Sequence, residues 1–226
     1  MVCRLFGLST ACDPDFGIFP PFEYGTAPDY LTNSNVHALI SELQLRKQTT
    51  GLSSLNETTS SSFVFSFLVV AASLFQFRII IKPQKQLQGR YGRGPVDFAF
   101  ESTPSGGFIG VTIVTGEDFT RGIAQNIVQL ESFLSNHKRE LTETTDTPAP
   151  PNRAFGLVTD ASVWYILECV MDSTERISVK MAEIVQVIEY KQHDWMMMVE
   201  DVYSHLVWLL LQILLKEDAE WMLSKQ

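Results

Sequence analysis

Residues 89–132, GRYGRGPVDFAFESTPSGGFIGVTIVTGEDFTRGIAQNIVQLES, place two short strands and a helix in immediate succession. Val96–Glu101 and Phe108–Thr115 are rich in β-branched and aromatic residues, and the segment STPSGG at 102–107 has the composition of a turn. From about Asp118 to His137, apolar residues recur every three or four positions, which predicts a helix with one apolar stripe. Two adjacent strands that lead directly into such a helix favour an α/β fold.

Further strands flank this segment on both sides. Phe77–Ile81 predicts a strand that stops before Pro83, so that three strands form a meander ahead of the helix. Ala154–Val158 and Val163–Val170 predict two more strands, and Ile177–Met181 adds an edge strand.

The chain closes with a long amphipathic helix from about Asp194 to Leu223. Its centre, HLVWLLLQILL at 205–215, is apolar nearly all round. A helix of this kind is unstable when it is surrounded by water, so we expect residues 205–215 to be buried against the sheet.

The first 76 residues carry weaker signals. Residues 1–34 are rich in Pro, Asp, Gly and aromatic side chains without a sustained period, which is typical of irregular chain. Ser34 is a candidate N-cap for one helix near residues 35–47. The sequence therefore predicts an N-terminal extension of uncertain order over residues 1–76 and one α/β domain over residues 77–226.

A Ser/Thr-rich stretch at residues 53–62 predicts a loop, and the apolar run FVFSFLVVAASLF follows it at 63–75. This run is shorter than the roughly 20 residues that span a bilayer, so we expect a buried helix or strand and no membrane contact. Residues 5–8 are too few for the core of a signal peptide, and the cysteines are too far apart for a disulfide or zinc pattern. These features predict an intracellular protein, either nuclear or cytoplasmic.

The formal net charge of −9 argues against a protein that coats nucleic acid, because such proteins usually carry a basic surface. One stretch departs from this average, since its five basic residues occur without an acid between them: Arg78, Lys82, Lys85, Arg90 and Arg93. We interpret Lys85, Arg90 and Arg93 as contacts for the phosphates of a nucleic acid beside Asp97. The alternative interpretation is a solvated loop between two strands.

Three phrases, GRGPVDFAF, GVTIVTGEDFTRGIAQNIVQLES and FGLVTDASVWYILEC, resemble the nuclease-like C-terminal domain of fungal Crinkler effector-type proteins over residues 77–215. The resemblance implies a PD-(D/E)XK, or restriction-endonuclease-like, core of a helix, a three-strand meander, a helix and two strands, followed here by the C-terminal helix. In that fold an acid on one strand and a Glu-X-Lys on the next hold Mg²⁺ and orient the attacking water. Asp97 matches the first acid, but Ile113 and Thr115 stand where the Glu and the Lys belong.

Cleavage of a phosphodiester with Mg²⁺ requires hard oxygen ligands, and Ile113 and Thr115 supply no carboxylate. The missing acid is a candidate for migration to Glu101, four residues after Asp97 on the same strand, or to Glu117 just beyond the next strand. In that case Lys82 would supply the positive charge. The alternative is that Asp97 is an ordinary hydrogen-bonded carboxylate, with Mg²⁺ bound weakly or not at all.

Gln125 and Gln129 are four residues apart and therefore share one face of the predicted helix. The functional interpretation gives Gln125 a role in orienting the catalytic site and gives Gln129 a contact with nucleic acid. A plain solvent-facing surface is the alternative.

The leading hypothesis from the sequence is a Crinkler-like protein with a degenerate nuclease site, which binds nucleic acid or a protein partner without efficient catalysis. The first alternative is an active Mg²⁺-dependent DNA endonuclease with a migrated acid. The second is an interaction protein that docks onto a partner or a second copy of itself through the C-terminal helix.

Overall fold

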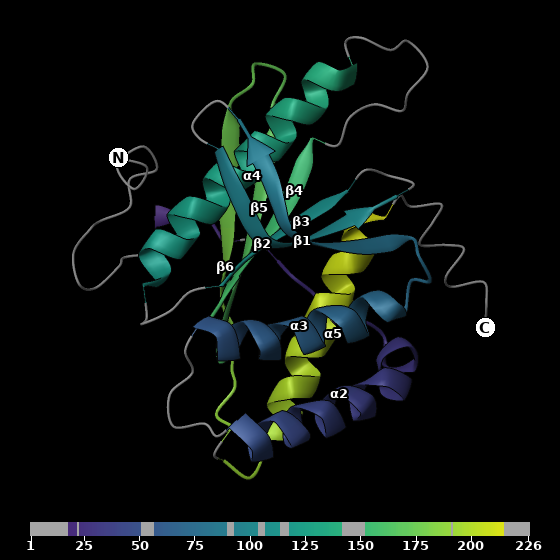
Figure 1. Ribbon diagram of the computed structural model, residues 1–226. Helices are drawn as coiled ribbons and strands as arrows, with labels where there is room; N and C mark the ends of the chain where they lie inside the picture. The colour runs from purple at the N-terminus through teal and green to yellow at the C-terminus, as the bar shows by residue number, and fades with distance from the viewer. Residues whose placement is uncertain are drawn as a thin grey trace.

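The computed structural model describes residues 18–21, 23–50, 57–89, 93–103, 107–113, 118–141, 152–190 and 192–214. These residues form a six-stranded sheet between two layers of helices (Figure 1). Helix α4 covers one face of the sheet, and helices α2, α3 and α5 gather on the other. The mixed α/β class that the sequence predicts is confirmed.

The strands follow one another in the sheet in the order in which they occur in the chain. They are β1 (Ile79–Gln88), β2 (Arg93–Ser102), β3 (Phe108–Ile113), β4 (Arg153–Thr159), β5 (Val163–Met171) and β6 (Ile177–Val187). All neighbouring strands are antiparallel except β3 and β4, which are parallel and are joined through α4 (Phe119–Leu141). The predicted meander, the central helix and the later strands are therefore confirmed.

Each face of the sheet carries its own apolar core. Helix α2 (Asp29–Thr50), α3 (Glu57–Ser73) and α5 (Trp195–Ile213) pack on side chains such as Phe100 and Val111. Helix α4 packs on the opposite face, against residues that include Phe108 and Leu167. Alternation of side chains along each strand explains how one sheet serves both cores. The boundary at residue 76 stays a prediction, but α2 and α3 lie before it and share a core with the strands after it.

Two N-terminal predictions need correction. Helix α2 begins at Asp29, directly after Pro28, and not at Ser34. Helix α3 begins at Glu57, so the second half of the predicted loop at 53–62 is helical. Tertiary burial overrides the weak helix propensity of serine here, because Ser60 and Ser66 are buried beside phenylalanines that fill the core. No helix within the described residues is long and apolar enough to cross a membrane.

Strand β1 and helix α5 also differ from the prediction at their ends. Strand β1 passes through Pro83 because it is the edge strand of the sheet, where a missing backbone N–H is tolerated. Helix α5 ends at Ile213, and Leu214 is already extended. The expected burial of the helix is confirmed from Leu206 to Leu214, while residues 215–223 lie outside the described residues. Most of the apolar surface of α5 is therefore unavailable to a partner.

Candidate functional site

Strands β2 and β3 separate at the place where the sequence puts its candidate site. The pairing between them ends at Phe98 and Val111. Strand β3 nevertheless continues beside β4 to Ile113, and β2 continues beside β1. The residues at this point, Pro95–Asp97 of β2 with Thr112 and Ile113 of β3, form what we call the strand fork.

Strands β1 and β2 change faces at the same level. Ile79 and Leu87 of β1 belong to cores on opposite faces of the sheet, although an even number of positions separates them. The same holds for Phe98 and Val96 of β2. The change in β1 falls near Gln84, whose φ of 48° lies in the left-handed region that side chains other than glycine rarely adopt. Such strain costs about 1–3 kcal/mol and concentrates at functional sites.

Asp97 connects the two strands of the fork. Its Oδ2 atom accepts a hydrogen bond of 2.8 Å from the backbone N–H of Ile113, and its Oδ1 atom lies 3.4 Å from Nε2 of Gln84. The side chain of Ile113 packs against the core of α2, α3 and α5. The structure thus brings Asp97 and Ile113 together, but through a backbone amide and not between two side chains. Thr115 and Glu117 lie outside the described residues.

A buried polar network from α4 closes the other side of the fork. Gln129 donates from Nε2 to the carbonyl oxygen of Pro95 at 2.8 Å and accepts a bond of 3.0 Å from the hydroxyl of Thr112. Asn126, which is fully buried, donates from Nδ2 to Thr112 at 3.0 Å and to the carbonyl oxygen of Gly110 at 3.1 Å. These bonds tie helix α4 to both strands of the fork.

The predicted role of Gln125 stays a prediction, whereas the surroundings of Gln129 differ from those of the expected contact with nucleic acid. Gln125 is exposed, whereas Gln129 is only 6% exposed and is engaged with the backbone and with Thr112. Gln129 is therefore a structural clamp and not a free contact for nucleic acid. The sequence held a signal for the neighbouring Asn126, because this polar residue interrupts the apolar stripe between Ile123 and Ile127.

Gly156 of β4 lies directly beneath the Asn126 side chain, and a Cβ atom there would overlap the Asn126 Oδ1 atom. We therefore expect Gly156→Ala to lower the free energy of unfolding by about 1–3 kcal/mol, as overpacking of a buried site does. Chemical denaturation of the two proteins measures this difference. In an Asn126→Ala background the clash is absent, so the same glycine substitution is expected to cost far less. Equal costs in both backgrounds would show that Asn126 is not the obstacle.

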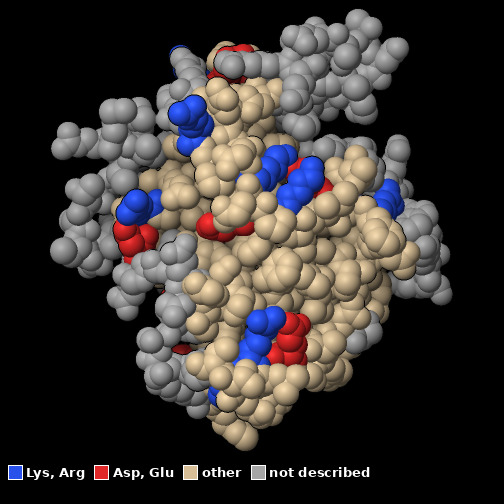
Figure 2. Space-filling model, in the orientation of Figure 1, with Lys and Arg blue, Asp and Glu red and all other residues tan. Residues whose placement is uncertain are grey.

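Two of the basic residues beside the fork share one acidic partner. Lys82 lies 2.6 Å from a carboxylate oxygen of Glu101, and Lys85 forms an ion pair with the other oxygen. Arg93 is exposed, and Arg90 lies outside the described residues. On the face drawn in Figure 2, the described Lys and Arg side chains are scattered, and several lie against an acidic side chain. Lys82, predicted to supply the positive charge of the site, and Lys85, predicted to contact phosphate, are both engaged with Glu101, and these two roles stay predictions.

The thiol of Cys169 is not a candidate nucleophile. The residue is buried on the α4 side of the sheet. Burial, together with the nearby charges of Glu131 and Glu168, raises the pKa of the thiol to about 12. A thiol with this pKa is protonated at neutral pH and is not a nucleophile.

The described residues also offer no cluster of metal ligands. No group of three or more His, Cys, Asp or Glu side chains among them is arranged to hold a metal ion. Polar side chains at or next to the fork, which include Asp97, Thr112, Asn126 and Gln129, are engaged in hydrogen bonds that hold the fork together.

Comparison with known proteins gives one informative match. The chain is 39% identical over 211 residues to Crinkler effector protein 1 of Rhizophagus irregularis, a match that covers 92% of this chain. The chain is similar to a Crinkler effector. The Crinkler-like resemblance seen at residues 77–215 is therefore supported, and it extends further than the sequence phrases indicated. Residues 77–226 are only about two thirds of the chain, so the match includes most of residues 1–76 as well.

The chain spans 44% of the length of this Crinkler relative. No protein-family model matches the chain, and no solved structure matches it significantly. The match thus supports a Crinkler-like protein, and the activity and partners of the relative are not carried over to this chain.

Proposed function

We propose that the chain is a Crinkler-like binding module, built on a restriction-endonuclease-like fold, in which the nuclease site has decayed. Two features support this fold. The order of a helix, a three-strand meander, a helix and further strands matches the expectation. Asp97 also stands at the fork between β2 and β3, which is where an acid and a Glu-X-Lys would have to meet.

The hydrogen bond between the Asp97 carboxylate and the backbone N–H of Ile113 is the main support for the proposed loss of catalysis. A Mg²⁺ ion that cleaves phosphodiesters needs more than one carboxylate among its oxygen ligands. At the fork, Asp97 accepts the backbone N–H of the very residue that should supply the second carboxylate, and the side chain at that position is an isoleucine in apolar surroundings. The described residues of the fork therefore do not fit a catalytic Mg²⁺ site.

Glu101 does not replace the missing second carboxylate ligand in this arrangement. Both carboxylate oxygens of Glu101 face lysines, Lys82 on one side and Lys85 on the other. The side chain of Glu101 is 17% exposed, whereas that of Lys82 is 49% exposed, so the carboxylate is the shielded partner of these ion pairs. An acid neutralised in this way is a poor metal ligand, and an active nuclease is the weaker proposal.

A protein ligand fits the module better than a nucleic acid does. Phosphate binding requires cations that are available to release counterions, and Lys82 and Lys85 share the carboxylate of Glu101, which lowers their combined positive charge without cancelling it. The chain as a whole carries a formal net charge of −9, which repels a polyanion. We therefore infer that the module recognises a protein surface and that the nuclease fold serves as its scaffold.

Incubation of plasmid DNA with the full chain and Mg²⁺ or Mn²⁺ is expected to leave the DNA intact, because Asp97 is the fork's single described carboxylate. The Asp97→Ala variant is the matched control and is expected to behave identically. Cutting by the unmodified chain that disappears in this variant would contradict the proposal. A gel shift on the same samples tests the ligand class, since tight and steeply salt-dependent binding would identify nucleic acid as the ligand.

A further inference from the structure

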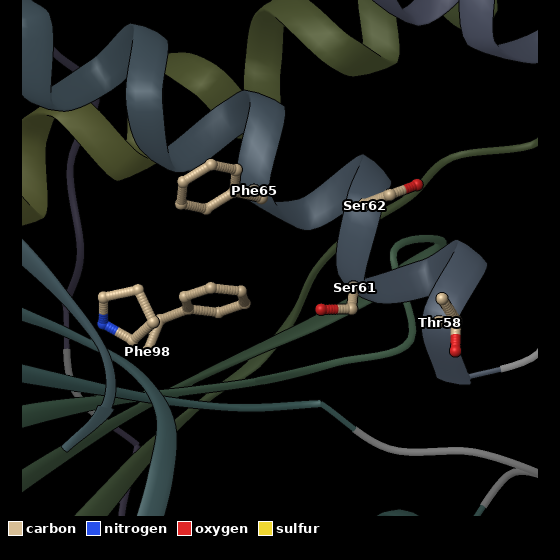
Figure 3. A pocket seen from close by; sticks show the side chains of 6 residues that line it. Thr58, Ser61, Ser62, Phe65 and Phe98 are labelled. Atoms are coloured by element: carbon tan, nitrogen blue, oxygen red, sulfur yellow. The ribbon is translucent and has the colours of Figure 1, made fainter.

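The two edges of the sheet differ in how open they are to an added strand. Strand β1 forms one edge, and Pro83 together with the left-handed backbone of Gln84 interrupts it, which protects an edge strand against pairing. Pro83 also lines a hollow of about 390 Å³ with Phe65 and Phe98, whose rings stack on each other (Figure 3). Strand β6 forms the opposite edge (Figure 1), and Ile177–Val187 contains neither proline nor glycine. Of these two edges, β6 is therefore the one that offers a continuous template.

The outer edge of β6 presents an uncharged row of residues. Pairing with β5 is regular from Ile177 to Ala182, so the backbone groups of alternate residues point away from β5. The backbone N–H of Met181 points outward, and by alternation those of Val179 and Ile177 do so too. The side chains of these three residues pack against the core on the α4 side of the sheet. Among the described residues, nothing accepts the outward N–H groups of Val179 and Ile177.

A segment from the N-terminal part of the chain already lies on this edge. Met181 donates its backbone N–H to the carbonyl oxygen of Pro20 at 3.1 Å, and the partly buried side chain of Phe19 packs against the core on the α4 side. Pro20 and Pro21 have no backbone N–H, so these two residues accept bonds from β6 but donate none. Ile18, next to Phe19, is 43% exposed. The edge thus takes up an aromatic side chain on the α4 side and a backbone carbonyl at Met181, from a segment that is held there loosely.

We propose that the module binds its protein partner by strand addition at the outer edge of β6, and that residues 18–21 cover this edge in the free chain until the partner displaces them. The partner supplies an extended peptide segment with apolar residues at alternate positions, one of them aromatic in the place of Phe19. Such a segment without proline donates as well as accepts, so it pairs with the outward backbone groups of both Val179 and Met181. The inference rests on the proposed function, the binding of a protein, and names the surface that performs it.

The probe is a fluorescent synthetic peptide with the sequence of residues 18–25, in which valine replaces both prolines. Its affinity is measured by fluorescence anisotropy for the full unmodified chain and for the full chain with Phe19→Ala, whose cover lacks the aromatic anchor. The Phe19→Ala chain is expected to bind the peptide at least about tenfold more tightly, because the tethered cover competes less well for the edge. Equal affinity for the two chains, or no binding to either, would overturn the proposal.

A substitution on β6 then locates the contact. The N–H of Val179 points away from β5, so Val179→Pro removes a donor from the edge and keeps the bonds between β5 and β6. Added to Phe19→Ala, it is expected to weaken peptide binding at least about tenfold, whereas the matched control Val179→Thr keeps the N–H and is expected to bind unchanged. Melting curves check the fold of each variant. A peptide N-methylated at alternate amides removes the same bonds without any change in the protein, and equal binding of this peptide would overturn the proposal.

The outcomes separate strand addition from the proposed function on which it rests. If the peptide failed to bind and DNA also remained unshifted in the gel, strand addition at β6 would be overturned and a protein ligand would still be favoured. Tight and steeply salt-dependent binding of DNA by the same preparations would overturn the proposed function itself. Sedimentation of the full chain tests a second copy as the occupant of the edge. A dimer that Val179→Pro abolishes would identify this occupant and overturn the peptide partner.

Discussion

A chain that ends after Tyr203 is expected to lose its cooperative unfolding transition. The truncation removes six buried apolar residues of α5 and its end: Leu206, Val207, Leu209, Leu210, Ile213 and Leu214. Burial of each such side chain contributes about 1.5–3 kcal/mol, so their loss is comparable with the entire stability of a typical domain, about 5–15 kcal/mol.

The same truncation removes contacts that hold the segment before α2. Ser204 accepts the backbone N–H of Ala27 at 3.0 Å, and Nδ1 of His205 lies 2.8 Å from the carbonyl oxygen of Gly25. Loss of the second half of α5 therefore also releases the chain that leads into α2. This coupling disfavours partial folding of the remaining protein, because one core would be left open at two places.

Thermal melting followed by circular dichroism measures the effect. A chain that ends after Leu214 retains every described residue of α5 and serves as the matched control, for which we expect an unchanged transition. If the chain that ends after Tyr203 melted at the same temperature as the control, α5 would be a detachable element. Its apolar surface would then be available to a partner, as the second alternative from the sequence required.

Local patterns predicted most of the fold. The apolar stripe of α4 marks its one buried face, and strands β3 to β5 are recognisable as short apolar runs because both faces of these central strands are buried. The wrong predictions occur where contacts with distant parts of the chain determine the local structure. Pro83 stops a central strand but is tolerated on the edge strand β1, and the sequence does not reveal which strand is the edge. The serine-rich start of α3 has the composition of a loop. Only the core that covers Ser60 and Ser66 shows why this segment is helical.

The candidate site was predictable only in part for a related reason. Strand spacing placed the side chain of Ile113 toward Asp97, whereas the structure joins Asp97 to the backbone N–H of Ile113 and packs the side chain in the core. The face change near Gln84 and the clamp from Gln129 depend on the separation of β2 from β3, which no local pattern encodes. The pairing of Lys82 with Glu101 likewise results from the register of β1 on β2. Residues that the sequence places in a functional site therefore form structural hydrogen bonds and ion pairs, because segments distant in the sequence pack beside them.

Introducing the Glu-X-Lys pattern of the proposed nuclease fold at the fork is expected to create a metal site that the described residues lack. In the double variant Ile113→Glu with Thr115→Lys, the new carboxylate must turn out of the apolar surroundings of residue 113 toward Asp97, and Mn²⁺ affinity is then expected to rise at least about tenfold. The bond from the Ile113 N–H does not prevent this, because a carboxylate has about four lone-pair positions. Titration calorimetry with Mn²⁺ measures the affinity, and addition of Asp97→Ala is expected to abolish the gain.

The matched control is Ile113→Gln with Thr115→Lys, which has the same shape without the new charge. Both variants lose the apolar packing of Ile113, so both are expected to be destabilised by about 1–3 kcal/mol, and only the Glu variant should bind metal. Equal Mn²⁺ affinity in the two would contradict a site at the fork. If the Glu variant bound metal without cleaving DNA, the groups around the ion would be the part of the site that is unsuitable for catalysis. Gln129 and Asn126 close the fork on the α4 side, and catalytic groups must be held within about 0.5 Å of their productive positions.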